Sequence, residues 1–462
     1  MKSLREKLTR YLSPGALIIL FLAVVSVLTA LLLPREEAEG IPFWVSAQPH
    51  YQAYKPFVAE WNARHPDRKI NLVQLHASAL ERRMLSGFLA GTPVADLVEP
   101  NSTTAAKGFA GPLSSVGYYD LTDHIQAEGL LERINPPSFA LFTTRRRIFG
   151  LPHDVHPVLL AYRADLVEAA GIDVSTIETW DDYFRVMSPL MRDRDGDGRP
   201  DRYLLEAWDS NPIAISILLL QADGKLLDEQ DRPALNDPRN AHILARLVTW
   251  FSGPKRVCID INQDSAIGHR QRLEGQVIGC LLPDWRAGQW KRENPGLGGK
   301  LKLMPLPAWE KGGRRTSGFG GTMLGINRHT QHFDTCWEFA KELYFSPRLA
   351  EQLFRDTNII TPVKALWSSP LFDQPDPYFS GQPSGRLYIN QAPHVPLRSS
   401  SPYYANAVAN IANAVSELKA HADRTRTFDE AALTRVAQAI LDRAQHAMER
   451  EVSRNLFLLQ EP

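Results

Sequence analysis

The stretch LLAYRADLVEAAG, residues 159–171, says most about how this 462-residue chain folds. Leu159–Tyr162 is an apolar run of strand length, and Ala164–Ala170 is a helical segment that stops at Gly171. The next helix is predicted over Thr179–Met187, with a threonine at its N-cap and two aspartates in its first turn, where the helix dipole favours negative charge. A strand followed directly by helices predicts a layered α/β structure.

The same alternation extends through the first hundred residues and again at the C-terminus. Strands are predicted at Ile41–Ser46, Lys69–Leu75 and Ala95–Val98, and helices at Tyr51–His65, Leu80–Ala90, Tyr403–Ala420 and Phe428–Arg450. We expect mainly parallel sheets. The proline-rich, aromatic-rich segment Pro362–Pro402 is interpreted as an ordered surface crossing. The length is too great for one simple core and favours two lobes.

Charge and cysteine content exclude some classes of protein. Lys plus Arg and Asp plus Glu both total 52, so no net charge draws the chain to nucleic acid. The cysteines at positions 258, 280 and 336 are widely spaced, with no metal-finger or dense disulfide pattern. One disulfide with a leftover thiol fits this spacing, but buried apolar thiols are favoured.

The N-terminal region predicts export. In Ala16–Leu33 the only polar residues are Ser26 and Thr29, and 18 residues at about 1.5 Å each reach roughly 27 Å, close to the thickness of a bilayer core. Basic residues precede this run and glutamates follow it, which places the rest of the chain outside the cytoplasm. We expect an N-terminal transmembrane helix that anchors the protein in the membrane, with a cleaved signal peptide as the alternative.

An acidic loop has the spacing of a calcium-binding loop. Aspartates at loop positions 1, 3, 5 and 9, with a backbone carbonyl at position 7, supply the hard oxygen ligands that Ca²⁺ prefers; these residues are Asp193, Asp195, Asp197, Asp201 and Arg199. Leu204 stands at position 12, where a calcium loop carries a bidentate glutamate, so Glu206 or a distant residue would have to complete the shell. A structural Ca²⁺ is expected, against a solvated acidic turn paired with neighbouring arginines.

Catalytic motifs are missing from the sequence. It contains no GxSxG, HExxH or P-loop pattern. The compact cluster His153, Asp154 and His156 lies between two prolines, and either contacts a polar ligand or makes ordinary hydrogen bonds. A metal or catalytic role for it is the less favoured reading. Tryptophans beside polar residues, Trp208 and Trp285 among them, could offer flat surfaces to the faces of sugar rings.

A dozen short motifs match one family in order. They include Trp61-Asn62, Ala95-Asp96-Leu97-Val98, Asp120-Leu121-Thr122, Phe149-Gly150-Leu151-Pro152, Ala161-Tyr162-Arg163-Ala164-Asp165, Thr179-Trp180-Asp181-Asp182, Glu274-Gly275-Gln276-Val277, Met304-Pro305-Leu306-Pro307 and Tyr403-Tyr404-Ala405. Each motif is weak alone. Together, from Trp44 to about Glu417, the chain resembles the extracellular solute-binding proteins of sugar-importing ABC transporters, the group that contains maltose-binding protein.

This resemblance implies a two-lobed α/β periplasmic-binding-protein fold with a hinge and an interlobe cleft. The implied domains are residues 1–40 as anchor or signal peptide, 41–155 with 322–372 as the first lobe, and 156–321 with 373–462 as the second. Hinge crossings are expected near Pro152–Pro157, Gly318–Thr322 and Ile360–Gln374. Such proteins close around the ligand by hinge rotation.

The resemblance also implies which side chains reach the cleft. They are Ser46, Gln48, Glu99, His153, Asp154, His156, Glu206, Trp208, Asp209, Trp285, Tyr403 and Tyr404. Arg314, followed by Arg315, departs from the pattern of maltose-binding protein and motivates the hypothesis of an acidic or amino sugar as ligand.

The function expected from the sequence is binding of a sugar or oligosaccharide by lobe closure, followed by delivery to an ABC permease. The protein is expected to be a monomer, with no catalytic cofactor and no enzymatic activity. One alternative keeps the fold and makes the protein a membrane-tethered sensor or scavenger. The other, less favoured, is a metal-assisted glycan hydrolase that uses His153, Asp154 and His156.

Overall fold

The structure is a computed structural model that describes residues 13–32, 39–193, 196, 200–228, 230–261 and 265–454. These belong to two compact units, Met1–Gly40 and Ile41–Pro462. The first unit holds helix α2 (Pro14–Leu32). Among the described residues, no helix combines the length and hydropathy of a membrane span, so the transmembrane helix expected over residues 16–33 is not supported.

The second unit begins with a sheet in the order β2-β1-β3-β13-β6, which forms the first lobe. Its strands are β2 (Ile70–Gln74), β1 (Ile41–Val45), β3 (Leu97–Glu99), β13 (Met323–Ile326) and β6 (Leu151–Pro152). Strand β1 runs parallel to β2 and β3, whereas β13 runs antiparallel to β3 and β6.

The second lobe is built on a sheet in the order β11-β7-β10-β8-β9. Its strands are β11 (Leu301–Pro305), β7 (Pro157–Arg163), β10 (Val277–Pro283), β8 (Tyr203–Glu206) and β9 (Cys258–Ile259), and β12 (Ser317–Gly318) pairs with β7. Strand β7 is antiparallel to its partners, while β8 is parallel to β9 and β10. Both sheets are therefore mixed, and the prediction of mainly parallel sheets is wrong. Strands β7 and β13 are reached by crossings between the lobes rather than by strand–helix–strand units, which alone impose a parallel direction.

The helices agree closely with the sequence periodicity. The longer ones are α3 (Gln48–Arg64), α4 (Ala77–Ala90), α10 (Trp180–Met187), α11 (Pro212–Gln221), α12 (Pro238–Phe251), α13 (Ala266–Leu273), α14 (Asp284–Glu293), α15 (Phe333–Tyr344), α16 (Pro347–Thr357), α17 (Ser384–Gln391), α18 (Tyr404–Thr425) and α19 (Glu430–Ser453). Shorter ones are α5 (Ser102–Lys107), α6 (Thr122–Ala127), α7 (Leu130–Arg133), α8 (Pro136–Ala140) and α9 (Ala164–Ala169), and a small hairpin joins β4 (Thr143–Thr144) to β5 (Arg147–Ile148). Segment 362–402, expected only as a crossing, includes helix α17.

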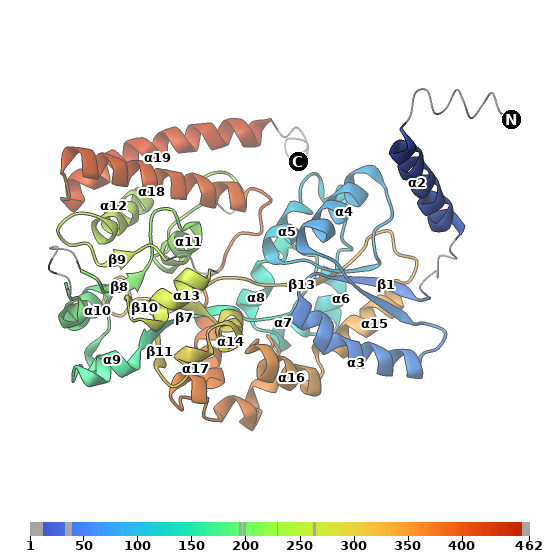
Figure 1. Cartoon of the computed structure of the whole chain (residues 1–462), viewed down its shortest axis with the longest axis horizontal. Helices are drawn as coiled ribbons and strands as arrows, with labels where there is room; N and C mark the ends of the chain where they lie inside the picture. The colour runs from blue at the N-terminus through green and yellow to red at the C-terminus, as the bar shows by residue number, and fades with distance from the viewer. Residues whose placement is uncertain are drawn as a thin grey trace. The chain divides into compact units, whose positions relative to one another are not determined.

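Each lobe has its own apolar core. Phe43, Tyr54 and Trp61 are fully buried in the first lobe, as Trp180 and Tyr183 are in the second. In the second lobe α18 and α19 pack along α12 (Figure 1). All three cysteines are buried and free, which confirms the interpretation as apolar thiols.

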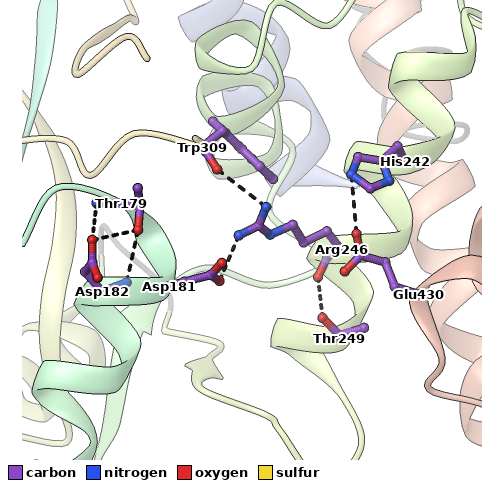
Figure 2. A network of polar contacts seen from close by, with 8 residues as sticks. All are labelled: Thr179, Asp181, Asp182, His242, Arg246, Thr249, Trp309 and Glu430. Carbon is purple, nitrogen blue, oxygen red and sulfur yellow. Dashed lines mark hydrogen bonds and ion pairs between the residues drawn. The ribbon is translucent and has the colours of Figure 1, made fainter. Parts of the chain in front are cut away.

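A polar network fixes the start of α10 against α12. Thr179 is the N-cap of α10, as the sequence predicted, and it also forms a reciprocal capping box with Asp182. The Arg246 guanidinium donates to the Asp181 carboxylate at 2.8 Å and to the Trp309 carbonyl at 3.5 Å (Figure 2). Figure 2 also shows His242 facing Glu430 at 3.4 Å, which links α12 to the start of α19. These contacts join the start of α10 and the start of α19 to α12.

The chain passes between the lobes at three places. Strand β6 ends at Pro152 in the first sheet and β7 begins at Pro157 in the second. The chain returns between β12 and β13, and passes again between Val363, packed in the first core, and Phe372, packed against the second sheet. The lobe boundaries given above stay a prediction.

Candidate functional site

A cavity of about 740 Å³ lies between the lobes and is called here the interlobe cavity. The first lobe contributes residues 47–50, 101–104 and Glu81, and the second lobe contributes four side chains of α14. Asp154 and residues 319–322 line it from two crossing segments, and Thr357 and Ile359 line it at the C-terminal end of α16. It therefore meets both lobes and the hinge at once.

Strand ends explain why these residues meet. Strands β1 and β3 are parallel, so the segments after Val45 and Glu99 lie at the same edge of the sheet. Gln48 begins α3 and lines the cavity. Ser46, between β1 and that helix, is half-buried and does not line it. The first-lobe wall also carries the hydroxyls of residues 102–104, and small hydroxyl and amide groups of this kind suit a ligand rich in hydroxyls.

Trp285 forms the aromatic part of the second-lobe wall. It follows β10 at the start of α14 and is half-buried. Its indole Nε1 donates to the carbonyl of Phe319 at 3.0 Å. Gly320 has φ 115°, and a Cβ there would lie 2.7 Å from the same nitrogen, so only glycine allows the indole this close to the hinge backbone.

A buried polar network lies under the first-lobe wall. Glu99 accepts hydrogen bonds from His50 Nδ1 at 2.7 Å, from the Tyr54 hydroxyl at 2.7 Å and from the Tyr344 hydroxyl at 2.9 Å. Burial alone would lower the pKa of His50, but the adjacent Glu99 carboxylate raises it above its usual value. Glu99, predicted as a ligand contact, is 1% exposed and does not line the cavity. It positions His50, which does.

The predicted cluster His153, Asp154 and His156 lies in the first crossing, but its members do different things. The ring centroids of His153 and His50 lie 4.1 Å apart, and burial holds the pKa of His153 well below its usual value. Asp154 lines the cavity and accepts the Thr322 backbone N–H at 3.0 Å, and burial raises its pKa to about 6. His156 has φ 45°, and burial lowers its pKa to about 3. Of the three, Asp154 alone lines the interlobe cavity.

Arg398 is one of several cavity residues that the sequence analysis missed, together with His50, Glu81 and Arg292. It lies on the segment Val395–Tyr403, called here the strap, which runs between α17 and α18. Its Nη2 donates to the Ser102 hydroxyl at 2.6 Å, and that hydroxyl donates to the Gly320 carbonyl at 2.9 Å. Nothing in the proline- and serine-rich sequence around position 398 marks it as a site residue.

Two further cavities share lining residues with the interlobe cavity or with each other, and Arg398 lines both. The helix cavity, about 580 Å³, runs along α11 and α18 and shares Thr103, Phe319 and Arg398 with the interlobe cavity. The basic cavity, about 480 Å³, shares Ser216, Arg398 and Tyr404 with the helix cavity.

These two cavities collect further predicted residues. Asp209 lines the helix cavity, and Tyr404 lines both. Tyr403, at the N-cap position of α18, is half-buried against the second core and lines none of the three cavities.

Three predicted ligand residues lie elsewhere. Glu206 accepts two hydrogen bonds from Arg272, at 2.7 and 2.8 Å, inside the second lobe. Trp208 lines a separate cavity of about 770 Å³, between the guanidinium of Arg256 and the ammonium of Lys419. Arg314 lines the basic cavity, where its Nη1 donates to Asp223 at 2.5 Å. The structure thus turns these three side chains away from the interlobe cavity.

The arginine pair at 314 and 315 does not line the interlobe cavity and therefore does not support an acidic sugar as the ligand. Arg315 donates to the carbonyls of Leu306 and Ile177 and is used within the second lobe.

The expected calcium loop is only partly described. Asp195, Asp197 and Arg199 lie outside the described residues. Asp193 accepts the N–H of Gly196 at 2.7 Å, and the Asp201 N–H donates to the Arg192 carbonyl at 2.8 Å. Within the described ranges, no three His, Cys, Asp or Glu side chains gather as a metal site would require.

Comparison with known proteins identifies a family and several relatives. Residues 45–346 match the family model of bacterial extracellular solute-binding proteins. The chain is 24% identical over 348 residues to an arabinooligosaccharide-binding protein of Halalkalibacterium halodurans, covering 74% of this chain and 76% of that one. It is 23% identical over 351 residues to a lactose-binding protein of Rhizobium radiobacter, covering 74% and 79%.

A solved structure shows the same fold. The sugar-binding protein MalE of Xanthomonas citri superimposes with a TM-score of 0.73 at 17% identity, over 92% of this chain and all of that one. At this identity the likeness concerns the fold alone.

Proposed function

This chain belongs to the family of bacterial extracellular solute-binding proteins, and we propose that it binds a sugar or oligosaccharide outside the cytoplasm and delivers it to an ABC permease. The observation that carries the proposal is the interlobe cavity, which is lined by both lobes and by the hinge segments between them. Its volume of about 740 Å³ is within the range of small-molecule sites.

The chemistry of the cavity wall suits a saccharide. Trp285 offers an indole face that can pack against the C–H groups of a sugar ring. Thr103, which is exposed, lines the cavity from the other lobe, and its hydroxyl can exchange hydrogen bonds with sugar hydroxyls. The neighbouring Ser102 and Thr104 hydroxyls are buried and already donate to the Gly320 carbonyl and to Glu81. Two curated relatives are named for binding arabinooligosaccharides and lactose, which supports an oligosaccharide as the ligand.

Lobe rotation explains how binding would be signalled to a permease. A ligand held by α14 on one side and by residues 101–104 on the other makes its full set of contacts only when the lobes are close together, so it favours that arrangement. Residues 153–156 and 319–322 are the short segments that would absorb the rotation.

Binding accounts for the site better than hydrolysis. A metal-assisted hydrolase needs several ligands around an ion and an activated water. His153 and His156 instead lie 3–4% exposed in the first crossing, and Asp154 alone of that cluster lines the cavity. The curated relatives above are likewise named as binding proteins.

The test is titration calorimetry of the purified protein with arabinose, galactose and glucose oligosaccharides, followed by assay of each sugar for turnover. We expect saturable one-to-one binding of at least one saccharide, with the sugar recovered unchanged. A panel without any binding, or cleavage of a bound sugar, would contradict the proposal.

A further inference from the structure

Arg398 is the residue that the three cavities have in common. It lines the interlobe, helix and basic cavities, which otherwise share few residues. The strap that carries it is held to both lobes: Ser400 donates to the Thr143 carbonyl in the first lobe, and Ser399 donates to Asp231 in the second at 2.9 Å. These two hydrogen bonds therefore hold the strap, and with it Arg398, next to all three cavities.

The charge of Arg398 has no counterion among the residues that the structure describes, because no carboxylate oxygen lies within 4.0 Å of its guanidinium. Its described contacts are the Ser102 hydroxyl and the face of Tyr404, whose ring centroid lies 4.6 Å away. Its Nε is buried without a hydrogen-bond partner. A half-buried cation with an unused donor is costly unless an anion completes it.

The carboxylates Glu81 and Glu293 in the interlobe cavity are already bonded, to Lys107 at 2.6 Å and to Gln289. Among the described residues Arg292 also has no carboxylate partner, but it is exposed, so water can hydrate its charge. Arg398 differs from Arg292 in that it is half-buried and its Nε has no hydrogen-bond partner.

The basic cavity extends the same positive field beyond Arg398. It is lined by Lys225, Arg239, Arg314 and Arg398. Arg314 pairs with Asp223 and Lys225 with Asp237, which leaves Arg239 and Arg398 without a carboxylate partner among the described residues. An anion at Arg398 would therefore feel attraction from the far side as well.

We propose that the ligand is an acidic saccharide whose carboxylate pairs with Arg398, an inference that rests on the proposed sugar-binding function. A planar guanidinium that stacks on a tyrosine ring presents its N–H donors in the geometry that a carboxylate accepts. The surrounding hydroxyls and Trp285 serve the rest of the sugar. The uncharged remainder of the ligand occupies the interlobe cavity, and the acid group points toward the basic cavity.

The test compares digalacturonate with its dimethyl ester, which keeps the sugar rings and removes the charge. Titration calorimetry of the full chain should show at least tenfold tighter binding of the acid. Arg398→Gln should weaken the acid at least tenfold and leave the ester unchanged. Arg292→Gln, which removes an equal charge from the same cavity wall, should keep the preference for the acid.

A second variant separates charge from lobe geometry. Ser102→Ala removes the hydroxyl that Arg398 contacts and keeps the cation, so the preference for the acid should survive. Equal affinity for acid and ester, or a preference lost equally in Ser102→Ala or Arg292→Gln, overturns the inference while sugar binding stands. If neither these ligands nor any neutral oligosaccharide binds, the proposed function itself fails, and this inference fails with it.

Discussion

Arg272 and Glu206 meet end to end inside the second lobe, with Nε and Nη2 of the arginine donating to both carboxylate oxygens at 2.7 and 2.8 Å. The two side chains are only 2% and 1% exposed, and the Cys280 thiol donates to the same carboxylate at 3.1 Å. This buried carboxylate does not line the interlobe cavity. It holds β8 to the end of α13.

Replacement of Glu206 should therefore affect stability rather than binding. Glu206→Gln leaves a buried guanidinium without its counterion, and we expect the free energy of unfolding to fall by about 3–5 kcal/mol. Saccharide affinity of the remaining folded protein should be unchanged. Urea denaturation and titration calorimetry on the same preparation measure the two effects.

The matched control for this prediction is Glu60→Gln. Glu60 also receives two hydrogen bonds from one arginine, Arg348, at 2.8 Å each, but both partners are more than half exposed. Because exposed pairs contribute little, this variant should unfold almost as wild type does. An equal fall in the free energy of unfolding in the two variants would contradict the stabilising role of the buried pair. Weaker saccharide binding by Glu206→Gln would contradict its separation from the ligand site.

The two tryptophans predicted to stack on sugars should behave differently. Trp285→Ala removes the indole from the interlobe cavity and should weaken saccharide binding at least tenfold, or about 1.4 kcal/mol. Trp208→Ala, in the separate cavity beside Arg256 and Lys419, should bind as wild type does. Calorimetry of both variants checks this prediction. A larger loss of affinity in Trp208→Ala would indicate that the ligand binds in the cavity beside Trp208 and not in the interlobe cavity.

Asp154 should give stability a defined pH dependence. Burial raises the pKa of its carboxyl to about 6, above the value of about 3.9 expected when unfolded. Between these values the folded protein keeps a proton that the unfolded chain has released. Raising the pH through this window therefore lowers the free energy of unfolding.

Asp154→Asn isolates this contribution from that of the neighbouring histidines. The amide oxygen can still accept the Thr322 N–H but does not titrate. Relative to wild type, the variant should gain up to about 3 kcal/mol of stability between pH 4 and pH 7, with no further gain above. Denaturation of both proteins across this range gives the difference, and a difference independent of pH would refute the assignment.

The calcium expectation remains open to a direct experiment. If the loop that begins at Asp193 holds Ca²⁺ in the folded state alone, millimolar Ca²⁺ should raise Tm, and a chelator should lower it. Asp195→Asn with Asp197→Asn removes two of the expected ligands and should abolish the difference. The same Tm with Ca²⁺ and with chelator would leave a solvated acidic turn as the correct reading.

Much of the fold was predictable because local patterns determined it. The helix predicted over Thr179–Met187 is found as α10 with its capping box, and the strand predicted at Ile41–Ser46 is found as β1. Strand direction was not predictable, since β7 and β13 owe theirs to the crossings between lobes and no local pattern records a crossing.

The site was predictable where it follows a strand end and unpredictable elsewhere. Gln48 and Trp285 line the interlobe cavity as the resemblance implied, because each begins the helix after a strand. Glu206 does not line the cavity, because it pairs with Arg272 inside the second lobe. The two residues are 66 positions apart, so sequence spacing gave no sign of this pairing. Arg398 was missed because only the folded structure shows that it lines three cavities.

The hydrogen bond from Trp285 to the Phe319 carbonyl also makes the fluorescence of Trp285 a possible measure of lobe movement. The indole rests on residues 319–321, where Gly320 and Gly321 have φ of 115° and 97° and the chain passes from one lobe to the other. Any reorientation of the lobes must bend this stretch and so change the polarity around the ring. Because the chain has ten tryptophans, the contribution of Trp285 would be obtained by comparing emission and iodide quenching of the protein with those of Trp285→Phe. That difference would report lobe movement without an attached dye.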